Sequence, residues 1–157
     1  MNLLLHIYEN DEGVTCFDRY FKYLKSIEKE MPQALAGFAM DPGRYELRGP
    51  RTLHDAWLMS LNVNKAYASE AGSTVNTAVA LGLLSAAQDS SIELHYCDVE
   101  EFRSSLSPDR WPDRPVDLLT HEITKVGDGL FRHHLQFDRS AWVQVSFRQF
   151  SFSCVER

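Results

Sequence analysis

The chain has 157 residues, 44% of them hydrophobic and 24% charged, and its formal net charge is -6. These values are ordinary for one globular domain over residues 1–157, and they exclude a long disordered tract or a coiled coil. Lys and Arg form no run that could follow a phosphate backbone, so nucleic acid is not an expected partner.

The N-terminal part predicts a strand followed by an amphipathic helix. Residues 3–8 are expected to form the strand, which ends at an NDEG turn. Thr15 and Asp18 have the spacing of a capping box, and Pro32 ends the helix before a second, short helix over residues 33–39. Apolar residues between them recur at steps of three and four, which places one stripe on one helix face. The stripe consists of Phe17, Tyr20, Phe21, Leu24, Ile27 and Met31.

From residue 57 onward, apolar residues alternate with polar or small ones, as in half-buried strands. Further runs of this kind cover residues 75–83 and 92–96, with small polar hairpin loops at 65–73 and 85–91. Residues 104–117 carry three prolines and predict a long surface loop. The first run places four side chains on one face, namely Trp57, Met59, Leu61 and Val63.

The last third of the chain predicts a meander of three strands, over residues 119–123, 131–137 and 143–147. Beyond Phe147 the apolar residues change phase, and one inserted residue at Arg148 or Gln149 predicts a β-bulge. We expect one α+β domain whose N-terminal helix packs on a large, mostly antiparallel β-sheet that curls toward a half-barrel.

Cysteine usage and apolar segments predict a cytoplasmic protein that stays off the membrane. Cys16, Cys97 and Cys154 are widely spaced and form no CxxC pair, so they are expected to be reduced and mostly buried. The opening MNLLLHIYEN lacks the basic start of a signal peptide, and no stretch is long and apolar enough to span a bilayer.

Local signatures of catalysis are missing, since the chain has no G-x-S-x-G, Walker, dinucleotide-binding or H-E-x-x-H pattern, and no cofactor is predicted. His54 and Asp55 are the pair best suited to acid/base chemistry, because a carboxylate can orient an imidazole; a turn cap is the alternative. Histidines on predicted strands could bind a metal if three shared one face, or could be hydrogen-bonded in a polar seam. They are His95, His121, His133 and His134.

Tryptophans outside the core are candidate interface anchors. Trp57 shares a strand face with apolar residues and is expected in the core, whereas Trp111 lies in the proline-rich loop between Arg110 and Arg114. Trp142 has the phase of polar residues on its strand, which predicts a place on the outer sheet face. These two tryptophans and two arginines form the predicted partner-binding set, with an aromatic cover over the core edge as the alternative.

The segment PRTLHDAWLMSLNV, between YFKYLKSIEKEMPQALAGFAMDPGRYEL and DLLTHEITKVGDGLFRHHLQF, resembles a group of small uncharacterised bacterial α+β proteins. In that group an LHDAWL-like phrase leads into an antiparallel sheet. Small acidic α+β proteins of similar kind are often immunity proteins, which neutralise a toxin by binding it. The resemblance transfers no catalytic residue.

Three functions follow as hypotheses. The first is a protein-binding or inhibitory, immunity-type protein without catalytic activity, whose partner is a protein such as a toxin. The second is an enzyme or metal-binding protein that uses His54, Asp55 and the strand histidines in a sheet cavity. The third is a structural homodimer subunit, because an open antiparallel sheet has edges that can pair.

Overall fold

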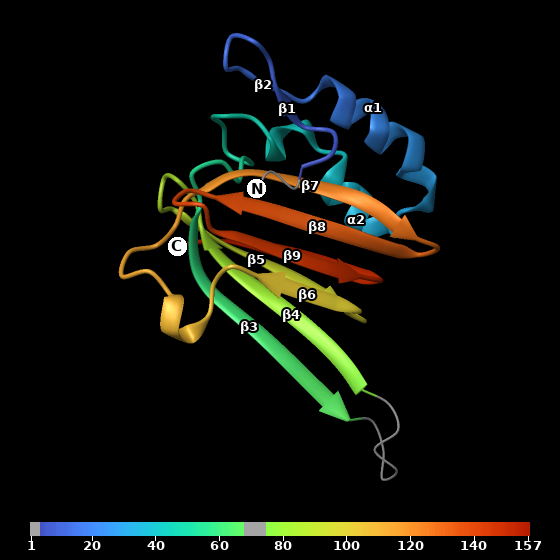
Figure 1. Ribbon diagram of the computed structural model, residues 1–157, viewed down its shortest axis with the longest axis vertical. Helices are drawn as coiled ribbons and strands as arrows, with labels where there is room; N and C mark the ends of the chain where they lie inside the picture. The colour runs from blue at the N-terminus through green and yellow to red at the C-terminus, as the bar shows by residue number, and fades with distance from the viewer. Residues whose placement is uncertain (1–3, 68–74) are drawn as a thin grey trace.

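The computed structural model describes residues 4–67 and 75–157. Its architecture is α+β with antiparallel sheets, as the sequence predicts (Figure 1). Within the described residues, every helix is too short or too polar to cross a lipid bilayer. The chain runs through β1 (Tyr8–Glu9), β2 (Thr15–Cys16), α1 (Asp18–Ile27), α2 (Gln33–Ala39), β3 (Trp57–Tyr67), β4 (Val75–Leu84), β5 (Ser90–Cys97), β6 (Glu101–Ser104), β7 (Leu118–Gly127), β8 (Leu130–Phe137), β9 (Trp142–Phe147) and β10 (Gln149–Glu156), with 3-10 turns at Glu28–Glu30, Pro42–Arg44 and Pro108–Arg110.

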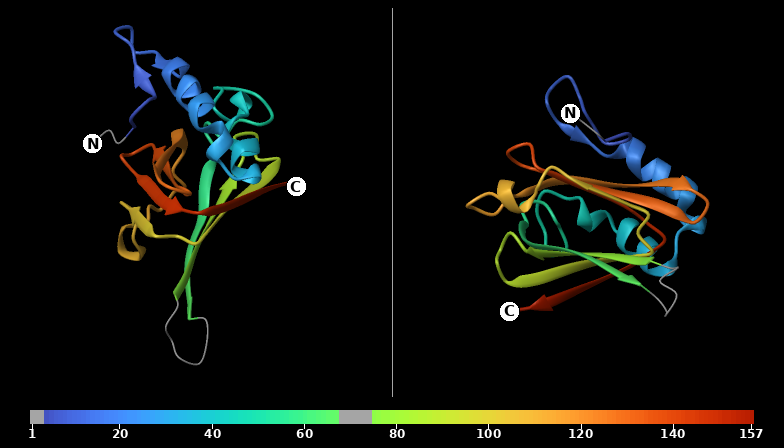
Figure 2. Two further views of the ribbon diagram at one scale, coloured as in Figure 1. Left: turned by 90° about the vertical axis from the view of Figure 1, so that its right-hand side faces the viewer. Right: turned by 60° about the horizontal axis from the view of Figure 1, so that its bottom comes forward.

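The strands divide between two four-stranded sheets and one small ribbon. Sheet I has the order β10-β5-β4-β3 and sheet II the order β6-β9-β8-β7, while β1 pairs with β2. The inner faces of sheets I and II supply most of one continuous hydrophobic core. Figure 2 shows the two sheets as layers with α2 between them at one end. Two layers with a shared core explain why apolar side chains alternate with polar or small ones along most strands.

Helix α1 buries only part of the predicted stripe, and it begins differently from the prediction. Tyr20, Leu24 and Ile27 are buried on its inner face. The capping-box prediction is wrong: Phe17 is the N-cap residue with no side-chain cap, because Thr15 pairs with Glu9 in the β1-β2 ribbon. The predicted N-terminal strand is also displaced, since the described strand covers only Tyr8–Glu9 and residue 3 lies outside the described residues.

Helix α2 is a wedge between the two sheets. The ring of Phe38 lies 5.9 Å from that of His121 and 6.0 Å from that of His133 in sheet II. On its other side, it lies 5.2 Å from the rings of both Phe150 and Phe152 in sheet I. Helix α2 therefore fills the space between the two sheets at this end of the core.

The phase change after Phe147 has a different cause from the predicted β-bulge. β9 ends at Phe147 in sheet II, and β10 begins at Gln149 in sheet I, so the chain crosses between sheets at Arg148. The Arg148 guanidinium donates to Glu100 Oε1 at 2.6 Å and to the Asp128 carbonyl at 2.9 Å, which anchors the crossing. Because the two strands face the core from opposite layers, the set of alternate positions that points inward changes at the crossing.

Strand β3 contains a β-bulge that the sequence pattern did not indicate. Its register with β4 shifts between Leu58 and Ser60, so Met59 leaves the core face and is 53% exposed. Beyond that point β3 and β4 extend past the body of the molecule as a two-stranded arm (Figure 1). The start of the hairpin loop predicted at 65–73 is wrong, because residues 65–67 belong to β3, and residues 68–73 of that loop lie outside the described residues.

Candidate functional site

The outer face of sheet II presents two rows of polar side chains that cross all four strands. Register places Glu122 beside His134, His134 beside Gln144, and Gln144 beside Arg103. These positions alternate along each strand with residues of the hydrophobic core, so their side chains point to the opposite, outer face of the sheet. The neighbouring row holds, in the same strand order, Thr124, Arg132, Ser146 and Glu101.

The two rows lie under a groove of about 360 Å³, which we call the sheet II groove. Trp142 gives it an aromatic wall: the indole stacks on the His134 imidazole with ring centroids 6.0 Å apart and planes at 28°. The groove therefore combines an aromatic surface with charges of both signs. Its lining residues are Leu5, Glu101, Arg103, Glu122, Thr124, Arg132, His134, Trp142 and Gln144.

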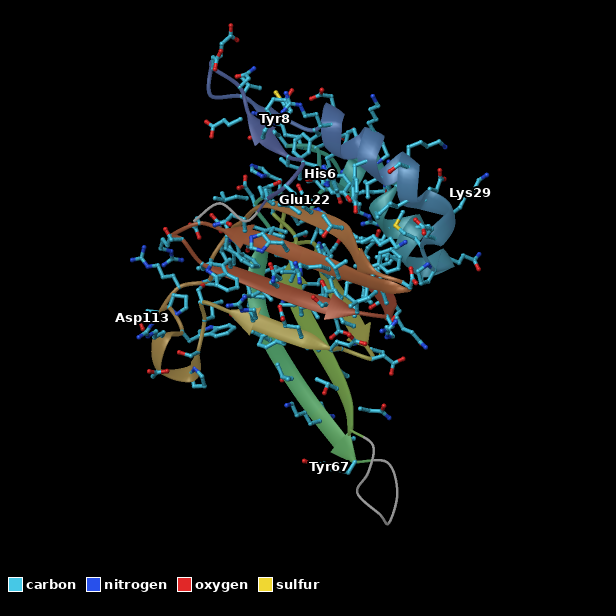
Figure 3. The ribbon with its side chains drawn as sticks, turned by 45° about the vertical axis from the view of Figure 1, so that its right-hand side comes forward. His6, Tyr8, Lys29, Tyr67, Asp113 and Glu122 are labelled. Carbon is cyan, nitrogen blue, oxygen red and sulfur yellow. The ribbon has the colours of Figure 1, made fainter. Side chains whose placement is uncertain are left out.

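Glu122 fastens the N-terminal segment across one side of this groove. Its carboxylate accepts backbone N–H bonds from Leu5, His6 and Ile7 at 2.9, 2.9 and 2.8 Å. Figure 3 shows Glu122 on β7 directly below His6. A buried carboxylate needs several donors, and three amides of one segment supply them. Glu122 therefore acts as a clamp for the segment.

His134 is buried under the groove wall, and burial lowers its pKa. Its Nε2 lies 3.2 Å from Gln136 Oε1, and since that oxygen can only accept, Nε2 carries the proton in the neutral ring. Its Nδ1 has no hydrogen-bond partner among the residues that the structure describes. A neutral imidazole stacked on Trp142 makes this wall rigid and uncharged.

The groove has one arginine held in place and one without a partner. Arg132 Nε donates to Ser146 Oγ at 3.2 Å, and its Nη2 lies 3.9 Å from Glu101 Oε1. The Arg103 side chain is exposed, and its guanidinium makes no hydrogen bond or ion pair with any other described residue. A guanidinium beside an indole is a common anchor for a protein partner or a carboxylate.

Two of the histidines considered as alternative metal ligands, His121 and His133, form part of a buried hydrogen-bonded line. Tyr96 Oη lies 2.7 Å from His133 Nδ1, His133 Nε2 lies 3.0 Å from His121 Nδ1, and His121 Nε2 lies 3.2 Å from the Arg44 carbonyl. Because that carbonyl can only accept, each neutral group must donate toward it in turn, starting from the Tyr96 hydroxyl.

Burial keeps every member of this line neutral. It lowers the pKa of His121 to about 4 and that of His133 well below its usual range, and it raises the pKa of Tyr96. The groups are sealed from solvent, with His133 0% exposed. This is the polar seam that the sequence allowed as the alternative to a metal site.

The remaining sequence candidates for a metal lie apart. His95 is on the outer face of sheet I, where its Nε2 contacts Glu93 Oε2 at 3.1 Å. Among the residues described, no three His, Cys, Asp or Glu side chains are grouped so as to hold a metal ion. The expectation of mostly buried thiols is wrong, since Cys97 and Cys154 are exposed and only Cys16 is half-buried.

His54 and Asp55 lie in the turn before β3. His54 Nδ1 lies 2.9 Å from the Leu119 carbonyl, to which it donates, and its Nε2 lies 3.5 Å from Asp55 Oδ1. Asp55 has a left-handed backbone, with φ 63°, and its amide donates to the Leu118 carbonyl. The pair is thus close in space and also forms part of a turn that binds the start of β7.

The predicted partner-binding residues are distributed over neighbouring parts of the surface. Trp142 lines the sheet II groove, whereas Trp111 is 39% exposed in the loop between β6 and β7, beside an exposed Arg110. Figure 3 shows this loop, marked by Asp113, beside sheet II.

Arg114 lines a second, more open groove of about 540 Å³, which lies where β3 begins and where the loop from β6 leads into β7. The Arg139 guanidinium donates to the Arg114 and Pro115 carbonyls there at 3.1 and 2.6 Å. Trp57 also lines this groove and is only half-buried, so its predicted place in the core is wrong. The β-bulge after Leu58 explains this, because Leu58 takes the core position instead.

Sequence reasoning did not identify Arg103, Arg132 or Glu122 as site residues. Their place among the polar positions of predicted strands was a usable signal for a shared outer face, but the alternation pattern does not specify the order of strands in a sheet.

Comparison with protein-family models, with curated proteins and with solved structures finds no match to this chain.

Proposed function

We propose that this protein acts by binding another protein, in the manner of an inhibitory, immunity-type factor, through the outer face of sheet II and the adjoining loop. The observation that carries the proposal is the pairing of Trp142 with the partnerless Arg103 in a groove. A few residues supply most of the binding energy at protein interfaces, and tryptophan and arginine are enriched among them.

The partner should insert a carboxylate side chain into the groove and should present a flat or apolar surface next to that side chain. Arg103 offers a free planar fork for a carboxylate, and the Trp142 indole offers the apolar contact. Trp111, Arg110 and Arg114 extend the same interface along the loop. A net charge of -6 favours partners that are neutral or basic overall, because long-range steering depends on the summed charge.

The test begins with capture of the tagged protein from its source lysate and native mass spectrometry of what is bound, followed by titration of the purified partner. Trp142→Ala and Arg103→Ala should each weaken binding by about thirtyfold, the effect of losing a central anchor. Arg48→Ala is the matched control, because Arg48 is exposed and lies outside both grooves. If Trp111→Ala with Trp142→Ala leaves the affinity of a demonstrated complex unchanged, the proposed interface is wrong.

Acid/base catalysis at His54 is the second candidate, favoured by the 3.5 Å contact between its Nε2 and Asp55 Oδ1. His54 also lines a separate groove of about 310 Å³ beside the N-terminal segment. In this function the Leu119 carbonyl orients the imidazole through Nδ1, and Nε2, beside the Asp55 carboxylate, exchanges the proton. An activity that survives His54→Ala unchanged would exclude it.

A further inference from the structure

Strand β3 is the outermost strand of sheet I and presents a free backbone edge from Met59 to Tyr67. Only its start is covered, because the Leu58 amide donates to the Val116 carbonyl at 3.0 Å. After that point, β3 pairs with β4, and no other described residue bonds the backbone groups on its far side. Figure 3 shows Tyr67 at the end of this strand, away from the body.

The corresponding edge of sheet II, strand β7, is capped by tyrosine side chains. On β7 the Ile123 amide donates to Tyr20 Oη and the Lys125 amide to Tyr23 Oη, each at 2.7 Å. The edge of β3 has no such caps from described residues, no proline, and no register shift after Ser60. Its single charged side chain is that of Lys65. A long and uncapped edge is a template for another strand.

Apolar side chains accompany the free backbone. Val63 is 45% exposed and Tyr67 is 69% exposed, and both lie on the strand face that continues the core side of sheet I. Met59, at the bulge, is exposed as well. Pairing with another strand would satisfy the backbone groups and remove apolar surface from water in one step.

A second copy of β3 fits this edge by symmetry. Antiparallel pairing centred on Val63, the midpoint of residues 59–67, uses all nine residues and sets Val63 against its own copy. Met59 then meets the copy of Tyr67, and Asn62 meets the copy of Asn64, which allows amide hydrogen bonds. Because the sum of paired positions is even, core-side residues stay on one face of the joined sheet.

Charge also favours a second copy at this edge. In the same register Lys65 lies opposite Leu61 of the other copy, so the two ammonium groups do not face each other. Neither β3 nor β4 contains an acidic residue, although the chain as a whole carries a charge of -6. The edge is therefore the part of sheet I where two acidic molecules can approach with little repulsion.

We propose that this protein forms a symmetric homodimer in which two β3 strands pair antiparallel about Val63. The two copies of sheet I then make one eight-stranded sheet with the order β10-β5-β4-β3-β3-β4-β5-β10. This surface is separate from the sheet II groove, so each copy keeps its groove available for a partner.

Sedimentation of the purified full chain over a range of concentrations tests this proposal. We expect a monomer–dimer equilibrium that Val63→Lys or Val63→Glu each weakens by at least about tenfold, because like charges are then set directly opposite. An equimolar mixture of the two variants should restore the dimer as a heterodimer. Val155→Lys is the matched control, since Val155 is an exposed valine on β10, the other outer strand of sheet I.

Three results would overturn the proposal. A wild-type chain that stays monomeric at every concentration excludes self-pairing. The free edge of β3 would then be open only to a strand of another protein. A dimer that Val155→Lys breaks and Val63→Lys leaves intact uses a different surface. A dimer that both Val63 variants lose while they unfold like the wild type, and that their mixture does not restore, is not paired with Val63 opposite its own copy.

Discussion

The neutral line from Tyr96 through His133 to His121 joins the two sheets inside the core. Tyr96 belongs to sheet I, and the two histidines belong to sheet II. Every ring nitrogen and the hydroxyl have a partner within 3.2 Å, so burial leaves no polar atom of these three side chains unsatisfied. As a result, neither imidazole can accept a proton without breaking or reversing a hydrogen bond of this line.

Stability should therefore fall as the solution is acidified. In the unfolded chain a histidine binds a proton near pH 6.5, whereas burial lowers the pKa of folded His121 to about 4 and that of His133 also. The stabilisation is fully present above about pH 6.5 and is lost as the pH falls toward the folded pKa. Each neutral buried histidine should reduce the free energy of unfolding by about 1.4 kcal/mol per pH unit across this window.

Denaturant unfolding at several pH values from about pH 7 to about pH 4.5 measures this dependence. His133→Phe with His121→Phe should flatten the slope, because the double variant has no buried imidazole in the line. A wild-type free energy of unfolding that stays constant across the window would contradict the assignment of neutral buried histidines.

At the scale of elements, β7 depends on α1 to complete its outer edge. The Ile123 amide donates to Tyr20 Oη, whose hydroxyl lies 3.1 Å from Tyr45 Oη, and Tyr45 donates to the Ala39 carbonyl at 2.9 Å. Burial raises the pKa of both tyrosines, so the hydroxyls keep their protons. A strand edge, a helix and the end of α2 are tied by one run of hydrogen bonds.

Tyr20→Phe should lower the free energy of unfolding by about 1–3 kcal/mol, because it leaves the buried Ile123 amide without an acceptor. Denaturant unfolding measures the change, and hydrogen exchange at the Ile123 amide should accelerate. Tyr8→Phe is the control, since its hydroxyl bonds Asp18 at the exposed surface. Equal losses in the two variants would mean that the edge cap contributes nothing specific.

Element types followed from the sequence more closely than their boundaries and phase did. Alternation predicted β4, β5 and the β7-β8-β9 meander because each has one face on the core. The bulge at Met59 gave no signal, because apolar residues alternate without a break over residues 57–63. The crossing at Arg148 was interpreted as a bulge, since either a bulge or a change of sheet shifts the apolar phase by one residue.

For the whole molecule, the wedge formed by Phe38 decides how the two sheets are spaced. Its ring contacts rings on both layers and is 0% exposed. Phe38→Ala should lower the free energy of unfolding by about 3–5 kcal/mol, because the removed ring leaves a cavity that two rigid sheets close only in part. Chemical denaturation reports the loss.

Phe21→Ala is the comparison for this prediction, because Phe21 on α1 is a phenylalanine that remains 37% exposed. Its loss should be clearly smaller than that of Phe38. Similar values for the two variants would show that α2 is not a wedge but a cover whose contact with the sheets is easily replaced.

The sequence by itself determined the class of this protein: antiparallel strands, an amphipathic first helix, a proline-rich loop, and inward phases for His121 and His133. These features depend on the periodicity of neighbouring residues, which local geometry converts into buried and exposed faces. Only the tertiary structure decided which strands share a sheet, that Glu122 clamps the N-terminal segment, and that Arg103 joins Trp142 in one groove. Such contacts join residues far apart in the chain, and alternation specifies a face without specifying the neighbour on it.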